Sequence, residues 1–141
     1  MLVTTPQNYA RTRARRFSVQ GVKARHRLKA ERMAPGDRIC WYLVRVAGFV
    51  ATATITSAAY EDHTPVWVST GAPDPYPWRV RIVRDVIRDP EHAVPAAALA
   101  TRLAFVRRWP AAHWRLAFQG NVHEIGARDF GVIERAIARQ R

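Results

Sequence analysis

The sequence predicts an α+β domain built on a small, strongly curved mixed sheet or barrel, flanked by short helices. The chain has 141 residues, the usual size of one domain with one core, so residues 1–141 are expected to form a single domain. About five or six short segments are rich in β-branched and aromatic residues, and helical patterns lie at both ends. Strand and helix do not alternate regularly, which disfavours a doubly wound parallel sheet.

The N-terminal residues Met1 to Thr4 predict a short strand, and a short helix follows it. Thr5 suits the N-cap, where its hydroxyl accepts a backbone N–H, and Pro6 suits the first helical position, where no N–H is needed. This helix should run to about residue 13. A second helix is expected over "KARHRLKAERM", ending before the turn-forming pair Pro35 and Gly36.

A β-hairpin is predicted next, from "DRICWYLV" and "GFVATATITSAAY" with a turn near Arg45 to Ala47. The second strand alternates between apolar and threonine-rich positions, so one face should be packed and the other partly wet. After the turn "EDHTP", the segment "VWVS" is expected to form a short edge piece. The Gly- and Pro-rich "GAPDPYP" is expected to be a loop.

The segment "WRVRIVRDVI" has the most regular strand pattern in the chain. Trp78, Val80 and Ile82 should lie on one face, with Arg79 and Arg81 on the other.

The last third of the chain predicts helices at both of its ends and strands between them. A helix should open at Pro95 in "PAAALATRL", and two short strands are expected in "HWRLAFQGNVHEI" around Gly120 and Asn121. The segment "ARDFGVIERAIARQR" should form an amphipathic terminal helix. Its apolar face would carry Phe130, Ile133 and Ile137.

The charge of the chain points to polyanionic partners. There are 23 Lys and Arg residues against 11 Asp and Glu, a formal net charge of +12, so nucleic acid is the first candidate. A lone cysteine, Cys40, suits a reducing compartment and is expected to be an inert core residue. Neither a membrane-spanning run nor a signal core is present, so a cytoplasmic protein with no membrane partner is expected.

Catalytic and metal-binding patterns are weak. The five histidines show no H-E-x-x-H spacing, the glycines form no phosphate-binding loop, and the carboxylates show no pairing. We therefore expect no enzymatic activity, no metal and no cofactor. A hydrolase using His123 with Glu124, or His63 with Asp62, ranks last among the alternatives. His123 is equally consistent with a pocket wall and with a satisfied core residue.

Nucleic-acid binding is supported by the placement of cations and aromatics. Ten of the 23 Lys and Arg residues lie between Arg11 and Arg38, opposed only by Glu31 and Asp37. A solvated helical face is the alternative, but this density suits phosphate contacts. Unpaired bases also need flat apolar faces for stacking. Backbone contacts are expected from Arg11, Arg15, Arg25, His26, Arg27 and Lys29.

Five tryptophans supply candidates for stacking, and most are expected to be core residues. Trp41, on a predicted strand, should be buried. Trp67 and Trp78 flank the Pro-rich loop, where an aromatic side chain can line the mouth of a cleft. Together with Tyr60, these two are the predicted stacking residues.

Five segments in order give the chain a resemblance to a known family. These are "QGVKARHRLK", "MAPGDRICWYL", "GFVATATI" with "YEDHTPVWV", "YPWRVRI", and "WRLAFQGNVHEIGARDFGVIERAI". They cover nearly the whole chain and resemble the uncharacterised, stand-alone EVE-domain proteins of bacteria. That family belongs to the PUA-like superfamily, beside the YTH and ASCH domains.

The resemblance implies a PUA-like fold and a binding module without enzymatic activity. YTH relatives read N6-methyladenine in RNA, and EVE domains are thought to read modified bases, particularly in DNA, often beside restriction or other defence proteins. The implied partner is therefore DNA carrying a modified cytosine or adenine. RNA binding and the sensing of a nucleotide or other small molecule are the alternatives, and a defence or restriction protein is a possible partner.

The resemblance also implies where the base is held. The turn Gly21, Val22, Lys23 and Ala24 corresponds to the YTH segment that carries a cage tryptophan, and this sequence has Lys23 there. Thr4, Thr5 and Asn8 resemble the polar side that bonds the base edge. The predicted base pocket contains Thr4, Thr5, Asn8, Gly21, Val22, Lys23, Ala24, Tyr60, Trp67, Trp78 and His123.

Overall fold

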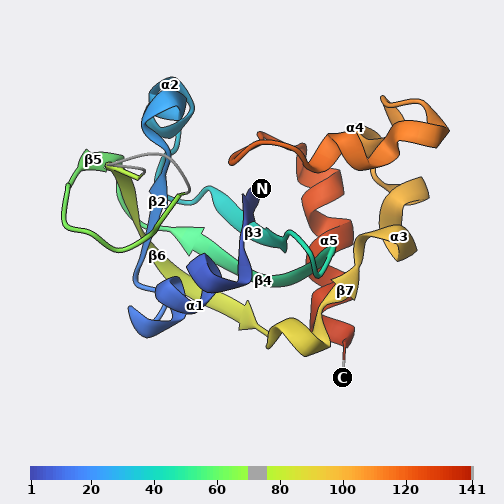
Figure 1. The fold of residues 1–141 in the computed structure, drawn as a ribbon, viewed down its shortest axis with the longest axis horizontal. Helices are drawn as coiled ribbons and strands as arrows, with labels where there is room; N and C mark the ends of the chain where they lie inside the picture. The colour runs from blue at the N-terminus through green and yellow to red at the C-terminus, as the bar shows by residue number, and fades with distance from the viewer. Residues whose placement is uncertain (70–75, 141) are drawn as a thin grey trace.

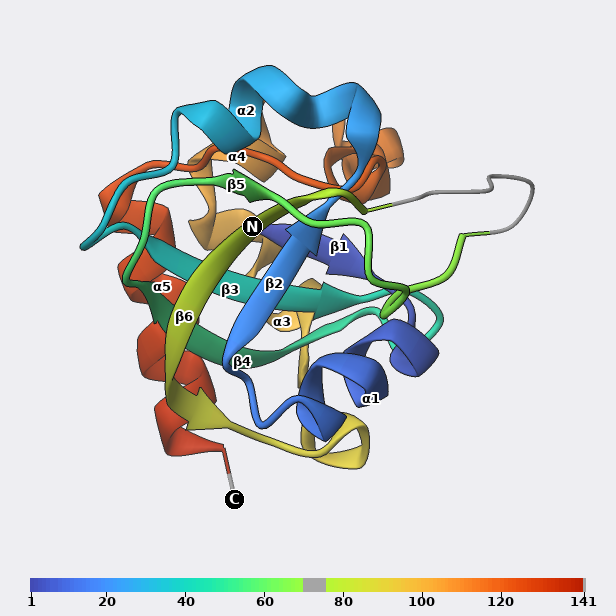
Figure 2. The same ribbon diagram turned by 90° about the vertical axis from the view of Figure 1, so that its left-hand side faces the viewer.

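A mixed seven-stranded sheet forms the centre of the computed structural model, which describes residues 1–69 and 76–140. The strands are β1 (Leu2–Thr4), β2 (Val19–Val22), β3 (Arg38–Leu43), β4 (Gly48–Ile55), β5 (Tyr60–Glu61), β6 (Trp78–Ile87) and β7 (Val94–Pro95). Their order is β1-β3-β4-β6-β2, with β5 on β6 and β7 on β4. β1 runs parallel to β3, and the other pairs are antiparallel. Figures 1 and 2 show the sheet strongly curled.

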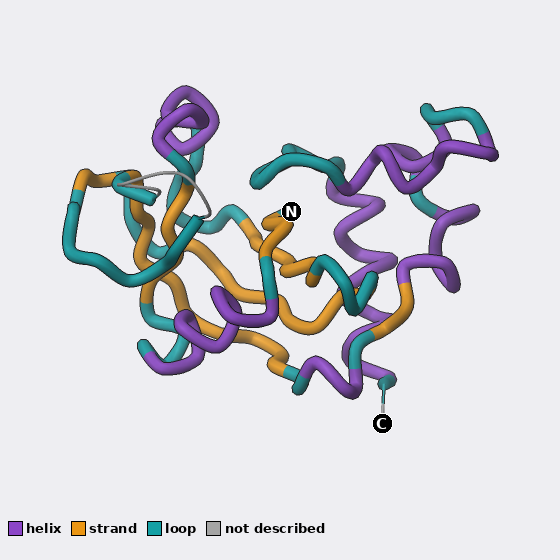
Figure 3. The backbone as a smooth tube through the Cα atoms, in the orientation of Figure 1, coloured by secondary structure: helices purple, strands orange, loops and turns teal. Residues whose placement is uncertain are grey.

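Short helices surround the curl, as Figure 3 shows in purple. The α-helices are α1 (Pro6–Ala14), α2 (Arg27–Glu31), α3 (Ala96–Leu99), α4 (Ala104–Arg107) and α5 (Ala127–Arg139). Four 3-10 helices are η1 (Ala24–His26), η2 (Pro90–His92), η3 (Ala100–Arg102) and η4 (Ala111–Phe118). None of the helices in the described ranges is long and apolar enough to cross a membrane. The predicted α+β architecture, a small curved mixed sheet flanked by short helices, is confirmed.

Two hydrophobic clusters lie on the two faces of the β3–β4 hairpin. Cys40 and Tyr42 pack towards α5 and η4, while Trp41 and its strand neighbours point into the curl. Both faces of β4 are buried, and Thr52 is fully buried. The prediction of a partly wet face was therefore wrong, because helices cover one side of the hairpin and the curl closes over the other. The predicted burial of Cys40 and Trp41 is confirmed.

The N-terminal predictions hold, but the next segments differ from those expected. Thr5 caps α1, with its Oγ1 accepting from Asn8 N at 3.1 Å. Residues 19–22 form β2, a strand that the sequence analysis missed. The helix expected over "KARHRLKAERM" is shorter and splits into η1 and α2. The terminal helix α5 is confirmed, with Ile133 and Ile137 fully buried.

Two further strand expectations were wrong, and one helix expectation is confirmed in shortened form. "VWVS" forms no strand over its described residues 66–69, and the short edge strand is β5 instead. The helix expected to open at Pro95 is present: Pro95, in β7, is the N-cap residue of the four-residue α3, and η3 follows it. The segment "HWRLAFQGNVHEI" forms the end of η4 and a single bridge between Leu2 and Val122 in place of two strands. Residues 71–75 of the predicted "GAPDPYP" loop lie outside the described residues.

Candidate functional site

Asn8 on α1 is held by the backbone of a segment sixty residues away. Its Nδ2 donates to Val68 O at 2.7 Å, and its Oδ1 accepts from Val68 N at 2.9 Å. Because Thr5 caps the helix and Pro6 begins it, the first turn of α1 fixes the position of Asn8. Asn8 is buried, so its carboxamide presents a donor and an acceptor side by side in a site with little water.

Two aromatic side chains lie beside this carboxamide. The rings of Trp67 and Tyr76 are 6.0 Å apart, and both residues are buried. Asn8 Nδ2 also donates to the Tyr76 hydroxyl at 3.3 Å, and Trp67 Nε1 donates to Thr12 Oγ1 at 2.8 Å. Burial raises the pKa of Tyr76, so the phenol stays neutral at ordinary pH.

Gly21 allows Trp67 to lie flat against β2. A Cβ at this position would stand 2.5 Å from Cζ3 of the indole, closer than any real contact. Gln20, its neighbour, donates from Nε2 to Gly21 O at 2.7 Å and accepts from Trp41 Nε1 at 2.8 Å. The sequence analysis missed Thr12 on α1 and Gln20 on β2, since a buried polar side chain whose partners are distant in the sequence gives no local signal. We call Asn8, Thr12, Gln20, Gly21, Trp67 and Tyr76 the Asn8 cluster.

Arg79 closes the Asn8 cluster from the side of β6. As expected, it lies on a different face of β6 from its apolar neighbours. Arg81 on the same face is exposed, whereas Arg79 itself is buried. Its guanidinium lies 5.1 Å from the Trp67 ring, donates from Nε to Tyr76 O at 3.2 Å, and also bonds Thr64 O. Asp62 lies 3.5 Å away and supplies a partial counter-charge.

Trp67 and Trp78 lie on opposite faces of the β2–β6 pair. In the antiparallel register Gly21 opposes Arg79 and Val22 opposes Trp78, and successive side chains point to opposite faces. Trp67 and Arg79 share the Gly21 face, whereas Trp78 packs against the core cluster that contains Val22. Arg27 covers the Trp78 ring at 4.8 Å. The structure therefore brings only one of these two predicted stacking residues to Asn8.

The other predicted pocket residues surround the cluster or lie in the core. Lys23 has its Nζ 5.9 Å from the Tyr76 ring, and burial followed by nearby Arg25 lowers its pKa. Its backbone N donates to Asn121 Oδ1 at 3.1 Å, while Val22 is fully buried and Ala24 begins η1. Thr4 ends β1 and bonds β3 through its backbone. Tyr60 lies on β5, with Arg81 over its ring at 5.5 Å.

The predicted phosphate-contacting residues lie on α1, η1 and α2. Arg11 donates to Val66 O at 3.3 Å and so borders the Asn8 cluster. Arg27 pairs with Glu31 within α2, and Lys29 donates to Val122 O at 3.0 Å. Arg15, Arg25 and His26 are exposed or half-buried, and no carboxylate among the described residues pairs with either arginine.

His123 lies away from the Asn8 cluster, in the wall of a separate hollow of about 560 Å³. This hollow lies between α2, the chain around residues 36–39 and the start of α5, and its rim includes Lys29 and Arg32. The His123 ring bonds Gln119 O, and burial lowers its pKa, so the imidazole is neutral at pH 7.

Asp89, Glu91 and His92 bring possible metal-ligand atoms within 4.8 Å of one another. All three side chains are at least partly exposed, and Arg13 pairs with Asp89. The arrangement is that of the short helix η2 with an ion pair on its surface.

Comparisons with known proteins place the chain in a family and confirm its fold. The profile of the EVE domain matches residues 1–136. A protein from Pseudomonas putida superposes with a TM-score of 0.59 at 18% identity, covering 97% of each chain. The YTH domain of Zygosaccharomyces rouxii MRB1, in complex with N6-methyladenosine RNA, gives 0.62 at 14% identity, covering 96% of this chain and 84% of that one. The comparison with curated proteins gives no significant match.

Another similar structure is that of the YTH domain-containing protein mmi1 in complex with RNA. Its TM-score is 0.60 at 11% identity, and the match covers 97% of this chain and 78% of that one. At these identities the likeness establishes the shared fold, which the curled sheet and short helices described above already display.

Proposed function

The chain belongs to the EVE domain family, and from that premise we propose that it is a non-enzymatic nucleic-acid-binding module that reads a modified base at the Asn8 cluster. The favoured ligand is a modified cytosine or adenine in DNA, with RNA as the alternative. The observation that carries the proposal is the contact between the Asn8 carboxamide and the backbone of Val68.

A base edge matches the groups that Asn8 now bonds. Val68 offers a carbonyl acceptor and an N–H donor to one carboxamide. Adenine and cytosine each offer an amino donor beside a ring-nitrogen acceptor, and asparagine pairs with adenine in this two-point way. A bound base would therefore replace Val68 at Asn8 without leaving either group of the carboxamide unpaired.

The aromatic residues of the cluster supply the flat surface that a base needs. Trp67 and Tyr76 stand next to Asn8, and Arg79 already lies over the Trp67 ring as a stacked cation does. Base stacking on an aromatic side chain contributes about 1–3 kcal/mol. Stacking combined with a two-point edge contact distinguishes one base from another, whereas charge alone does not.

Cations around the cluster suit the phosphates on either side of the held base. Lys23 lies near the Tyr76 ring, Arg11 borders Val66, and Arg25 follows on η1. Each phosphate that such a cation neutralises releases counterions and adds affinity that falls with salt. The similar YTH domain that is in complex with N6-methyladenosine RNA supports a ligand of this class for the shared fold.

The test is fluorescence anisotropy with single- and double-stranded DNA and RNA. Each oligonucleotide carries one cytosine or adenine that is plain, methylated or hydroxymethylated, and titrations are run at two salt concentrations. We expect at least a tenfold preference for one modified base, and we expect it to persist at the higher salt because the edge contact is not ionic. Equal affinities that salt abolishes would refute base reading and leave a general polyanion binder.

Single-residue variants then show which side chains contact the base. Asn8→Ala and Tyr76→Leu should each lower affinity for the preferred base about ten- to a hundredfold, since each removes one of the two recognition contacts. Trp78→Leu, on the other face of the β2–β6 pair, is the matched control and should leave affinity unchanged. Thermal melts confirm that each variant is folded. The reverse pattern would place the base at Trp78 instead.

A further inference from the structure

A second basic and aromatic surface lies outside the Asn8 cluster. Between Glu91 and Glu124 the sequence contains no Asp or Glu but four arginines, Arg102, Arg107, Arg108 and Arg115. All four are exposed, and none has an ion pair with any carboxylate of the described residues. They stand on η3, α4 and η4, whereas the cations expected to hold phosphates stand on α1, η1 and α2.

Trp109 follows two of these arginines directly and is 41% exposed, the only tryptophan among the large hydrophobic side chains that the fold leaves exposed. Leu116 is also exposed, and Arg115 lies 4.5 Å from the ring of the half-buried Trp114. Part of the Trp109 ring is therefore open to solvent, next in sequence to arginines that have no ion pair among the described residues. The same combination of cations and an accessible ring is what single-stranded nucleic acid requires.

The backbone that carries this surface is held by capping and core packing. The carboxylate of Asp129 on α5 is buried and accepts from Ala104 N at 2.9 Å and Phe105 N at 3.0 Å, so it caps α4 from another helix. Val106 of α4 is buried, and Trp114 meets Phe118 edge-on at 6.1 Å. The exposed arginines therefore occupy fixed positions at the end of a packed element.

The two basic surfaces lie where a single nucleic-acid strand could contact both of them. Figures 1 and 2 both show α2 and α4 on the upper side of the molecule, at opposite ends in Figure 1. The chain after η4 runs between them and contacts α2, since Lys29 donates to Val122 O and Arg32 pairs with Glu124 at 2.7 Å. The segment after η4 thus links α4 and η4 to α2, which carries the expected phosphate contacts Arg27 and Lys29.

We propose that Arg107, Arg108, Trp109 and Arg115 form a second nucleic-acid contact surface, which binds the strand that flanks the base held at the Asn8 cluster. The arginines neutralise phosphates and Trp109 stacks on an unpaired base. This inference rests on the proposed function, because it takes the flanking strand to belong to the same ligand.

The experiment compares a short oligonucleotide, which covers only the Asn8 cluster, with a long single-stranded one that carries the same central base. The variants are Arg107→Ala with Arg108→Ala, and separately Trp109→Ala. The matched control is Arg135→Ala with Arg139→Ala, which removes the same charge from exposed positions on α5. All four proteins are titrated at several salt concentrations.

We expect the Arg107 and Arg108 double variant to bind the long strand more weakly than the control does, with a salt slope smaller by about 1.4 because two phosphate contacts are lost. Trp109→Ala should weaken binding of the long strand roughly five- to a hundredfold. Affinity for the short oligonucleotide should change no more than in the control. Equal losses in the two double variants would show that only net charge matters and would overturn the proposal.

This experiment distinguishes failure of base reading from failure of the second surface. If no modified base is preferred but the α4 variants still weaken the long strand more than the control, base reading fails and the second surface stands. If a modified base is preferred and the α4 variants match the control, the second surface is refuted. Binding by α4 to an acidic protein rather than to nucleic acid would give that second result.

Discussion

At the scale of single residues, Asn8 connects folding with the proposed base reading. Its carboxamide bonds Val68 in the structure, so under this proposal a base displaces that backbone before it meets Asn8. The free energy of the displaced contact is subtracted from the affinity, because only the fraction of molecules with a free carboxamide is ready to bind. The site therefore gains selectivity, since a ligand that offers one hydrogen bond cannot replace two.

Gly21 is the position where a single methyl group should disturb the site. A Cβ there meets Trp67 Cζ3 at 2.5 Å, so Gly21→Ala must push the indole away from β2. We expect a loss of about 1–3 kcal/mol in the free energy of unfolding and a shift in tryptophan fluorescence. Denaturant unfolding followed by fluorescence measures both.

Gly131→Ala is the control for that substitution. Gly131 lies inside α5, and the closest atom to an added Cβ is the mobile end of Arg135 at 3.1 Å. Alanine favours a helix interior, so this variant should be more stable by up to about 1 kcal/mol. Equal effects of the two substitutions would contradict the close packing of Trp67 on Gly21.

His123 should make stability depend on pH. Burial, followed by nearby Lys29 and the chain terminus, lowers the pKa of His123 below its ordinary 6.5, although its bond to Gln119 O opposes this. The unfolded chain then binds more protons than the folded one below pH 6.5, so stability is full above that value and falls as the pH decreases through the folded pKa. Thermal melts of wild type and His123→Gln should diverge below pH 6.5 and run parallel above it.

His26 contributes to the same pH dependence in the same direction. Burial lowers its pKa, and Lys29, Arg25, His123 and Lys23 add to the effect. The double substitution of His26 and His123 by glutamine should therefore flatten the profile further than either single one. A profile that keeps its full slope in the double variant would assign the pH dependence to other groups.

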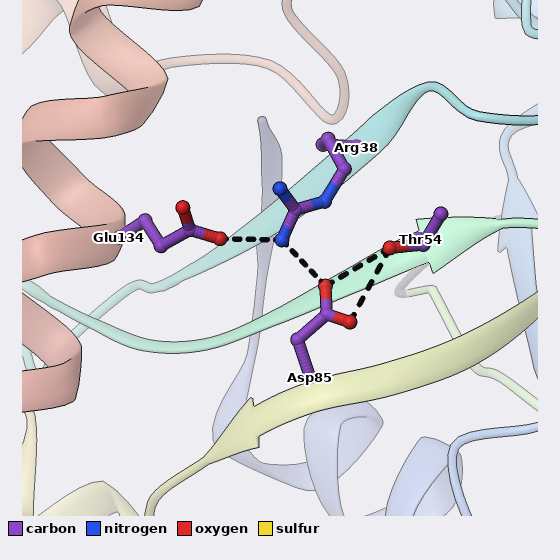
Figure 4. A network of polar contacts seen from close by, with 4 residues as sticks. All are labelled: Arg38, Thr54, Asp85 and Glu134. Carbon is purple, nitrogen blue, oxygen red and sulfur yellow. Dashed lines mark hydrogen bonds and ion pairs between the residues drawn. The ribbon is translucent and has the colours of Figure 1, made fainter.

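At the scale of elements, one arginine connects α5 to the sheet. Figure 4 shows Arg38 on β3 between Asp85 on β6 and Glu134 on α5. The Asp85 contact is 2.6 Å, Thr54 also donates to Asp85, and the guanidinium lies 4.8 Å from the Phe130 ring. The three ionic side chains are about one-third exposed, so the network is partly shielded from solvent.

Removing the charge of Glu134 and removing that of Arg38 should lower the free energy of unfolding by different amounts. Glu134→Gln removes one ionic contact and should cost up to about 1 kcal/mol in the free energy of unfolding. Arg38→Met should cost more, since it also removes the contact with Phe130 and leaves Asp85 and Glu134 without their shared cation. Urea unfolding of both single variants and the double variant measures the coupling.

The Arg27 and Glu31 pair on α2 is the control for the network. Both side chains are largely exposed and four residues apart on one helix, so Arg27→Met should cost only about 0.3–0.5 kcal/mol. If Arg38→Met lowers the free energy of unfolding by no more than that, the network does not hold α5 on the sheet. The buried Ile133 and Ile137 would then hold it by apolar packing alone.

At the scale of the whole molecule, the net charge of +12 acts against folding as well as in favour of polyanion binding. Raising the ionic strength to about 0.15 M shortens the screening length to about 8 Å and weakens the self-repulsion. We expect the melting temperature to rise over this range, by about 2–4 °C for each kcal/mol gained. Differential scanning calorimetry without nucleic acid measures it.

A variant with less charge provides the comparison. Arg135→Glu with Arg139→Glu lowers the net charge by four at exposed positions of α5 and should flatten the dependence of melting temperature on salt. A melting temperature that falls with salt would instead show that ion pairs such as Arg32 with Glu124 stabilise the fold more than the surplus charge destabilises it.

Local features were predictable from the sequence because they depend on nearby residues. The Thr5 cap, the hairpin of β3 and β4, strand β6 and the amphipathic helix α5 all follow from short-range preferences or periodicity. The five ordered segments indicated the family, and the family profile and the fold confirm it. The positive charge is a property of composition alone.

The tertiary structure decided which residues meet. The pairing of β2 with β6 sets Trp67 and Arg79 on one face and Trp78 on the other, and no local pattern encodes that register. Asn8 meets Val68 and Tyr76 only because the chain returns after sixty residues. The sequence by itself determined the Thr5 cap, the β3–β4 hairpin, β6, α5, the family and the charge. Long-range pairing decided which aromatics join Asn8 and which arginines remain unpaired on α4, because those contacts join segments far apart in the chain.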